Sequence, residues 1–324
     1  MTLLSKDQFG CPYLLLAPME GVGDRCFRKA MASIGGYDEG VTEFIRVPSQ
    51  PHIKSLVKHY ESNETNPIPL AAQIMGSDPE FMSLVAYELA LKGAPRIDLN
   101  CGCPSNTVTG RGAGSSLLKT PDLLYQIAKK MVDSVSVPVT IKMRSGYEDT
   151  SLFRENLLAA QESGVQFITV HPRTKVDGYG PPADWNRISE AKELLKIPVV
   201  GNGDILNAND AVRMLKETRC DALMVGRGAV INPFVFHQIR TAFSGESFQP
   251  SWNQLKGYFD VYLNEISPDM PMRNKISKLK QLFSFLFKGN EVLTEQRQTI
   301  LRAAPESLDA LMEFALPILK AGFE

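Results

Sequence analysis

Residues 13–243 alternate short β-rich runs with amphipathic helical stretches, and this alternation constrains the fold more than any other feature of the chain. We expect eight strands, at 13–17, 41–44, 68–74, 96–99, 137–143, 166–170, 197–200 and 222–225. Helical segments lie between them, several after a capping Asp or Thr, for example at 79–92, 121–135, 152–163 and 208–217. Eight such units predict a parallel (β/α)8 TIM barrel. A doubly wound open sheet is the competing fold, and the number of strands disfavours it.

The strand signal stops near Pro250, and four helical patterns follow, at 252–265, 273–287, 294–303 and 306–319. We therefore divide the chain into a catalytic barrel, 1–245, and a small helical domain, 246–324. Between Arg273 and Arg302 this domain carries seven Lys and Arg against two Glu, which leaves a local charge of +5 in a chain of formal charge −1. Such a surface either binds a polyanion or is an ordinary solvated helix face.

The composition is that of a globular protein, with 44% hydrophobic and 22% charged residues. The sequence contains no run of eighteen apolar residues, and its first residues lack the apolar core of a secretion signal, so we expect a cytoplasmic protein. Five cysteines, an odd number in a long chain, favour free thiols. The one-residue spacing of Cys101 and Cys103 and only four histidines give no metal-ligand pattern.

The end of each predicted strand carries residues able to do chemistry, and in a TIM barrel these ends form the face that holds the active site. In strand order they are Met19 and Glu20, Glu43, Gln73, Asn100 and Cys103, Lys142 and Arg144, His171 and Arg173, Asn202 and Asp204, and Gly226 and Arg227. Glycines cluster after the last two strands, at 201–204 and 226–228, where barrels commonly hold a phosphate through backbone N–H groups. We expect a phosphorylated ligand there.

Three strand-end side chains favour a flavin as that ligand. The amide of Gln73 can donate to and accept from the pyrimidine edge of a flavin, and the cation of Lys142 can lie against the N1–O2 side of the ring. His171 adds a further donor. Each residue has an alternative: a loop contact for Gln73, an ion pair with Asp98 for Lys142, and a core position for His171. The residues alone do not separate flavin from another phosphorylated ligand.

Two cysteines stand in the segment 100–104, which follows the fourth predicted strand and ends in a proline. Free cysteine is most often a small buried side chain, and we assign that role to Cys101. A thiol on a stiffened loop at the carboxyl end of a strand is instead placed for chemistry, and we assign that role to Cys103.

Seven short segments lie in order along the barrel and match the motifs of one family: APMEGV at 17–22, TEF at 42–44, DLNCGCP at 98–104, KMRSG at 142–146, VHPRT at 170–174, GNGDI at 201–205 and MVGRG at 224–228. On these segments the chain resembles the tRNA-dihydrouridine synthases, most of all their bacterial C branch. Two departures are visible. Pro172 stands where that family usually has glycine, and Ser115 and Ser116 replace small alanines.

The resemblance implies an enzyme that uses flavin mononucleotide (FMN), with NADPH as electron donor, to reduce the C5–C6 double bond of uridines in tRNA, at position 16 for the C branch. It implies that the flavin ring is held by Ala17, Pro18, Met19, Gln73, Lys142 and His171. Its phosphate would be bound by Asn202, Gly203, Asp204, Gly226 and Arg227. Cys103 would give a proton to C5 as a hydride reaches C6. Contacts to the substrate would come from Asn100, Arg144 and Arg173.

The helix predicted at 273–287 places an apolar stripe, Ile276, Leu279, Phe283 and Leu286, on one face. The basic side chains Arg273, Lys275, Lys278 and Lys280 are then available for tRNA phosphates, and Arg297 extends the surface. Tyr179 and Trp185 either stack on a base or pack their loop. The glycine-rich segment 110–114 is interpreted as a lid beside Cys103, with an inert loop as the alternative.

Two other functions remain open. One is a flavin barrel that reduces a small-molecule pyrimidine or enone, and the other is a tRNA-binding protein without catalysis. No protein partner and no metal is implied.

Overall fold

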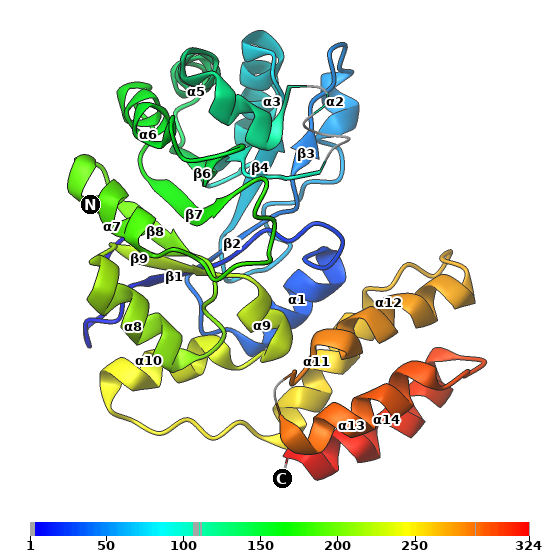
Figure 1. The fold of residues 1–324 in the computed structure, drawn as a ribbon. Coiled ribbons are helices and arrows are strands. Elements are labelled where there is room, and N and C mark those ends of the chain that lie inside the picture. The colour runs from blue at the N-terminus through cyan, green and yellow to red at the C-terminus, as the bar shows by residue number, and fades with distance from the viewer. Residues whose placement is uncertain (1–3, 106–109, 111, 289, 324) are drawn as a thin grey trace.

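Eight parallel strands close into a barrel in the residues that the structure, a computed structural model, describes: 4–105, 110, 112–288 and 290–323 (Figure 1). The barrel closes because β2 pairs with both β1 and β4. Its strands are β1 (Tyr13–Leu16), β2 (Glu39–Val41), β4 (Leu70–Met75), β5 (Ile97–Cys101), β6 (Val139–Gly146), β7 (Ile168–Thr174), β8 (Val199–Asn202) and β9 (Ala222–Val225). A short additional strand, β3 (Ile45–Arg46), pairs with the end of β4. The TIM-barrel prediction is confirmed, and the open sheet is excluded.

Helices follow the strands and cover the outside of the barrel (Figure 1). The longer ones are α1 (Arg25–Ile34), α3 (Pro79–Leu91), α5 (Pro121–Ser134), α6 (Phe153–Glu162), α7 (Asn186–Leu194), α8 (Ala208–Thr218) and α10 (Val235–Ser244). The shorter ones are α2 (Ile53–Leu56), the 3-10 helix η1 (Gly114–Lys119) and α9 (Arg227–Ile231). Asp24 and Asp78 cap α1 and α3 by accepting hydrogen bonds from backbone N–H groups, which fixes where these helices begin.

Three strands, β2, β6 and β7, differ from the prediction by three or more residues at their carboxyl ends. β2 stops at Val41, where the hydroxyl of Thr42 accepts the backbone N–H of Gln73 in β4 (3.0 Å), and Glu43 accepts a hydrogen bond from the backbone N–H of Gly21 (2.7 Å). β6 and β7 run on to Gly146 and Thr174, so Arg144 and His171 lie within strands. Their orientation is therefore set by the sheet.

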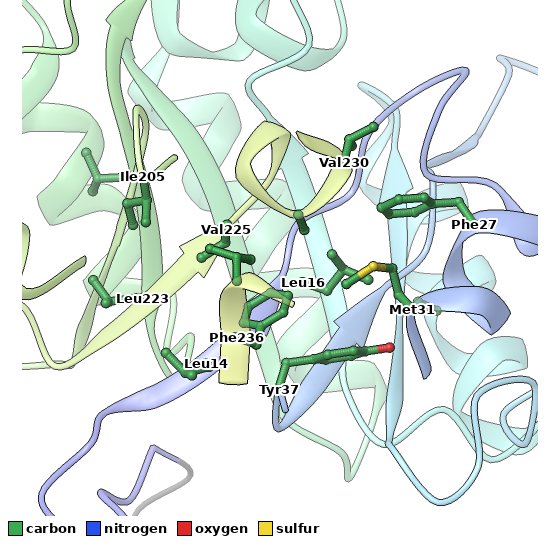
Figure 2. Close-up of a cluster of buried hydrophobic side chains, with 14 of the residues drawn as sticks. Leu14, Leu16, Phe27, Met31, Tyr37, Ile205, Leu223, Val225, Val230 and Phe236 are labelled. Atoms are coloured by element: carbon green, nitrogen blue, oxygen red, sulfur yellow. The ribbon is translucent and has the colours of Figure 1, made fainter. Parts of the chain in front are cut away.

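Alternate side chains of β1 point to opposite sides of the sheet, as strand geometry requires. Leu14 and Leu16 face the helices and pack in the cluster that contains Phe27, Met31 and Phe236 (Figure 2). Leu15, between them, packs in a separate cluster with Val41, Ala71 and Phe167. Each large side chain buried in this way contributes about 1.5–3 kcal/mol, so the barrel is a solid scaffold for its loops.

Four helices form a separate bundle beside the barrel, after an extended segment near residue 250 (Figure 1). They are α11 (Trp252–Asn264), α12 (Met272–Phe285), α13 (Glu291–Arg302) and α14 (Leu308–Phe323), close to the four predicted ranges. Ion pairs attach the bundle to α1: Glu265 binds Arg25 (3.1 Å) and Lys29, and Lys278 contacts Asp24, which lies just before α1. Within the described ranges, the helices all lack the length and apolar composition needed to cross a membrane.

Candidate active site

A cavity of about 470 Å³ opens at the carboxyl ends of the barrel strands. It brings together nearly all of the barrel residues predicted for the site: Ala17, Pro18, Met19, Gln73, Asn100, Cys103, Lys142, Arg144, His171, Asn202, Gly203, Asp204, Gly226 and Arg227. Arg173 does not line it. Two aromatic side chains that were not predicted for the site, Phe44 and Phe285, also line the cavity. Because Phe285 ends α12, the helical bundle borders the mouth of the cavity.

Lys142 and His171 place one cation and one neutral imidazole in this cavity. Burial, and then the positive charge of Arg144, lowers the pKa of Lys142 to about 8. Within the described part of the chain, the ammonium has no hydrogen-bond or ion-pair partner, so the suggested ion pair with Asp98 is not formed. Burial and the positive charge of Lys142 lower the pKa of His171 to about 2, so its imidazole is neutral near pH 7.

Cys103 is half-buried at the cavity wall, whereas Cys101 is fully buried in the core, as predicted. The side-chain carbonyl of Asn100 accepts hydrogen bonds from the backbone N–H groups of Gly102 and Cys103, both at 2.9 Å. Ser115, at one of the two unusual serine positions, donates its hydroxyl to the Cys103 carbonyl (2.9 Å). Burial raises the pKa of the Cys103 thiol, so it stays protonated near neutrality.

The predicted phosphate-binding end combines an unusual turn with three charged side chains. Gly203 and Asp204 both have positive φ, at 110° and 54°, and successive residues of this kind can aim backbone N–H groups at an anion. The Asp204 carboxylate binds Arg173 through two hydrogen bonds (3.0 and 2.7 Å) and Arg227 through one (2.9 Å). Although burial opposes it, hydrogen bonding to Arg173 holds the pKa of Asp204 below its usual range. Two guanidinium groups around one carboxylate leave this end net positive.

Arg144 and Arg173, predicted to contact the substrate, both bind the protein itself. Arg144 donates to the backbone carbonyls of Gly102 (2.9 Å), Thr174 (2.7 Å) and Gly178 (2.9 Å). It therefore joins the loop of Cys103 to the loop after β7. Arg173 donates to the Pro181 carbonyl (2.7 Å) and to Asp204. These hydrogen bonds give Arg144 and Arg173 a structural role, and they do not test the prediction that the two residues bind the substrate.

Tyr179 and Trp185, each predicted either to stack on a base or to pack its loop, differ in their exposure. Trp185 is buried and its indole N–H donates to the Gly203 carbonyl (3.0 Å), so it packs its loop against the barrel. Tyr179 is 59% exposed and lines the cavity. The centroid of its ring lies 5.3 Å from the guanidinium carbon of Arg144 and 5.0 Å from that of Arg227. In the predicted lid, Arg111 lies outside the described residues.

The basic surface of the bundle is smaller than predicted. Arg273 is exposed, but Lys275 donates to the Pro268 carbonyl (2.9 Å) and Lys280 to the carbonyls of Leu301 (2.9 Å) and Ala303. The expectation that Lys278 faces outward is wrong, because this side chain is half-buried against Asp24. Arg297 is also partly buried. The helix period identified the apolar face but not these long-range partners.

An eight-stranded parallel barrel with a cation and a thiol in a pocket at its carboxyl face has the architecture of a TIM-barrel enzyme. The chain belongs to the dihydrouridine synthase family, whose family model matches residues 15–312. The match covers both the barrel and most of the helical bundle.

Named relatives agree with this assignment. The chain is 38% identical to the tRNA-dihydrouridine(16) synthase of Shewanella oneidensis, over 84% of this chain and 88% of that protein. It is 39% identical to the tRNA-dihydrouridine(16) synthase of Salmonella typhimurium, over 89% and 94%. Among solved structures, its fold resembles that of an old yellow enzyme homologue from Zymomonas mobilis, with a TM-score of 0.53 and 13% identity over 80% of this chain and 98% of that one. Morphinone reductase has a TM-score of 0.51 and 12% identity, over 77% and 92%.

Proposed function

We propose that this protein reduces a uridine of tRNA, at position 16, to 5,6-dihydrouridine, with bound FMN and with NADPH as the electron donor. The observation that carries the proposal is that one cavity holds a half-buried thiol at Cys103 and the ammonium of Lys142, which has no ion-pair partner in the described part of the chain. The family assignment and the names of the relatives support the same reaction.

The residues of the cavity fit a flavin. Among the described residues the partly buried ammonium of Lys142 has no ion-pair partner, which is costly, and the electron-rich edge of a flavin ring would relieve that cost. Gln73 keeps one N–H and one carbonyl lone pair after its hydrogen bonds to Asp98 and Asn100, which suits an imide edge that both donates and accepts. At the other end, the Gly203–Asp204 turn and Arg227 suit a phosphate.

The chemistry that a bound flavin supplies is transfer of a hydride to C6 of the uracil. Cys103 holds the proton that C5 then requires, and burial keeps that proton on sulfur near neutral pH. Lys142, while protonated, stabilises negative charge in the same cavity, and the neutral His171 can donate a hydrogen bond without adding a second charge. The Asn100 carbonyl fixes the turn that carries the thiol.

A uridine stacked in tRNA has to leave the stack to enter this cavity, at a cost of about a few kcal/mol. Contacts with the helical bundle would offset that cost, because phosphate contacts fix the register of the RNA without reading its sequence. The bundle borders the cavity through Phe285, and Arg273 is exposed on the same helix. We therefore place tRNA across α12, with Arg273 as its most accessible predicted contact.

The test uses the purified protein with unmodified tRNA transcript and NADPH. We expect a yellow protein that releases FMN on denaturation, and formation of dihydrouridine in tRNA but not in free uridine at the same concentration. Reduction of free uridine at an equal rate would favour the small-molecule reductase. A colourless protein that cannot take up FMN would favour the RNA-binding protein without catalysis.

A further inference from the structure

A chain of side-chain hydrogen bonds crosses the barrel interior and ends at the backbone of Cys103. Asp98 accepts a hydrogen bond from the Gln73 amide N–H (2.7 Å), and the Gln73 carbonyl accepts one from the Asn100 amide N–H (2.8 Å). The Asn100 carbonyl then accepts the N–H groups of Gly102 and Cys103 (both 2.9 Å). Asp98 and Gln73 are fully buried, and Asn100 is 8% exposed.

The barrel register builds this chain. Gln73 and Asp98 are paired positions of β4 and β5, and Asp98 and Thr140 are paired positions of β5 and β6. Their side chains therefore point to the same side of the sheet at the same level. Asn100 lies two residues further along β5 and so points the same way, one layer nearer to the cavity.

Both ends of the chain have a fixed polarity. At the lower end, the Asp98 carboxylate accepts from Thr140 (2.6 Å) and Arg96 (3.3 Å) as well as from Gln73. A carboxylate only accepts, and a backbone N–H only donates. The amides of Gln73 and Asn100 lie between these two ends. Every donor then meets an acceptor in one orientation only, in which each NH2 group points towards Asp98.

We propose that Asp98 is a positioning residue, which orients the amides of Gln73 and Asn100 and thereby holds the Cys103 turn and the polar edge of the flavin site in place. The inference deepens the proposed function and rests on it for the identity of the reaction. Asp98 lies below the cavity and does not line it, so it acts through the two amides.

Asp98→Asn keeps the size of the side chain but reverses the donor and acceptor in each hydrogen bond from residue 98 to Asn100. Arg96 and Thr140 both donate, so they draw the new amide oxygen, and its NH2 group then faces Gln73. Gln73 must present its carbonyl to that group, and Asn100 must in turn present its own carbonyl to Gln73. The NH2 group of Asn100 then faces the N–H groups of Gly102 and Cys103, donor against donor, and the turn loses its acceptor.

The matched control is Glu39→Gln. Glu39 accepts from the other side of the same buried guanidinium, Arg96 (2.7 Å), but takes no part in the chain. Both variants replace one buried carboxylate on Arg96 with an isosteric amide. A general effect of lost charge would appear in both, whereas an effect of amide orientation would appear only in Asp98→Asn.

The experiment compares the two variants as FMN-loaded and as flavin-free proteins. For Asp98→Asn we expect the uridine-reduction step to slow by about tenfold or more with KM for tRNA unchanged, and the absorption spectrum of bound flavin to shift. In the flavin-free protein, alkylation of Cys103 should become faster than in wild type. Glu39→Gln should match wild type in all three. Equal behaviour of the two variants, or wild-type behaviour of Asp98→Asn, would overturn the inference.

Gln73→Leu breaks the same chain without changing a buried charge, and it carries the test if Asp98→Asn does not fold. It too should speed alkylation of Cys103 in the flavin-free protein, and an unchanged rate would count against the inference. The positioning role of Asp98 and the proposed function can fail separately. A wild type that forms no dihydrouridine, with alkylation still faster in Asp98→Asn, would remove the proposed function and leave the positioning role intact.

Discussion

Replacing Lys142 by methionine should make the flavin-free protein more stable while it abolishes tight binding of flavin. Lys142 is a partly buried cation whose pKa is lowered from 10.5 to about 8, mainly by burial. Each tenfold change in protonation corresponds to about 1.4 kcal/mol, so the protonated lysine costs the folded chain about 3 kcal/mol. Methionine has a similar length and carries no charge, so it removes that cost.

The pH dependence of this gain has a definite sign. The folded pKa lies below the unfolded one, so between pH 8 and 10.5 the unfolded chain binds more protons and wild-type stability rises with pH. The advantage of Lys142→Met should therefore be about 3 kcal/mol at pH 7, about 1.4 kcal/mol at pH 9.5, and close to zero at pH 10.5.

Urea unfolding of the flavin-free proteins at these three pH values measures the effect. Lys130→Met serves as the control, because Lys130 is 47% exposed and pairs with the exposed Glu80, so its loss should change stability by about 0.5 kcal/mol or less. A Lys142→Met protein that is less stable than wild type at pH 7, or an advantage that does not change with pH, would refute the reasoning.

Four further predictions concern other parts of the molecule. Cys103→Ala should keep FMN but slow formation of dihydrouridine by about 100-fold or more, measured by single-turnover kinetics; a rate near wild type would remove the thiol from the mechanism. His171 is neutral in the folded protein but is protonated below about pH 6.5 in the unfolded chain, so the wild type loses stability as the pH falls. Between pH 7 and 5, the free energy of unfolding of His171→Gln, measured in urea, should fall by about 2 kcal/mol less than that of wild type. Arg96→Ala should destabilise the protein by about 3–5 kcal/mol, because it leaves two buried carboxylates unpaired, whereas the exposed Arg154→Ala should be nearly neutral. Arg273→Glu should weaken tRNA binding and flatten its salt dependence with FMN content unchanged, and unaltered affinity would reduce this side chain to a solvated one.

The fold and the membership of the pocket followed from the sequence, because parallel strands in a barrel bring their carboxyl ends to one face. Gln73, Cys103 and Lys142 lie far apart in the chain and still line one cavity. Strand ends were less predictable. β2 ends three residues before the prediction, and Glu43 accepts a hydrogen bond from the backbone N–H of Gly21, a partner that no periodicity reveals.

The hydrogen-bond and ion-pair partners of polar side chains could not be predicted from the sequence when the two residues lie far apart in the chain. Lys278 reads as part of a solvated helix face, yet it contacts Asp24 of the barrel. Arg173 reads as a free cation at a strand end, yet Asp204 binds it through two hydrogen bonds. The role of Asp98 needed the register of β4 and β5, since a lone acid in an apolar strand gives no sign of which amide it faces. A helix or strand period indicates the face on which a side chain lies, but not its partner.

The most direct test of the account maps dihydrouridine in tRNA from cells that lack this gene, by mass spectrometry of nuclease fragments. Reduction of the uracil double bond adds two hydrogens, so the affected position is identified by mass. The account predicts that position 16 reverts to uridine and that wild-type protein, but not Cys103→Ala, restores dihydrouridine there. An unchanged position 16, or equal restoration by Cys103→Ala, would contradict it.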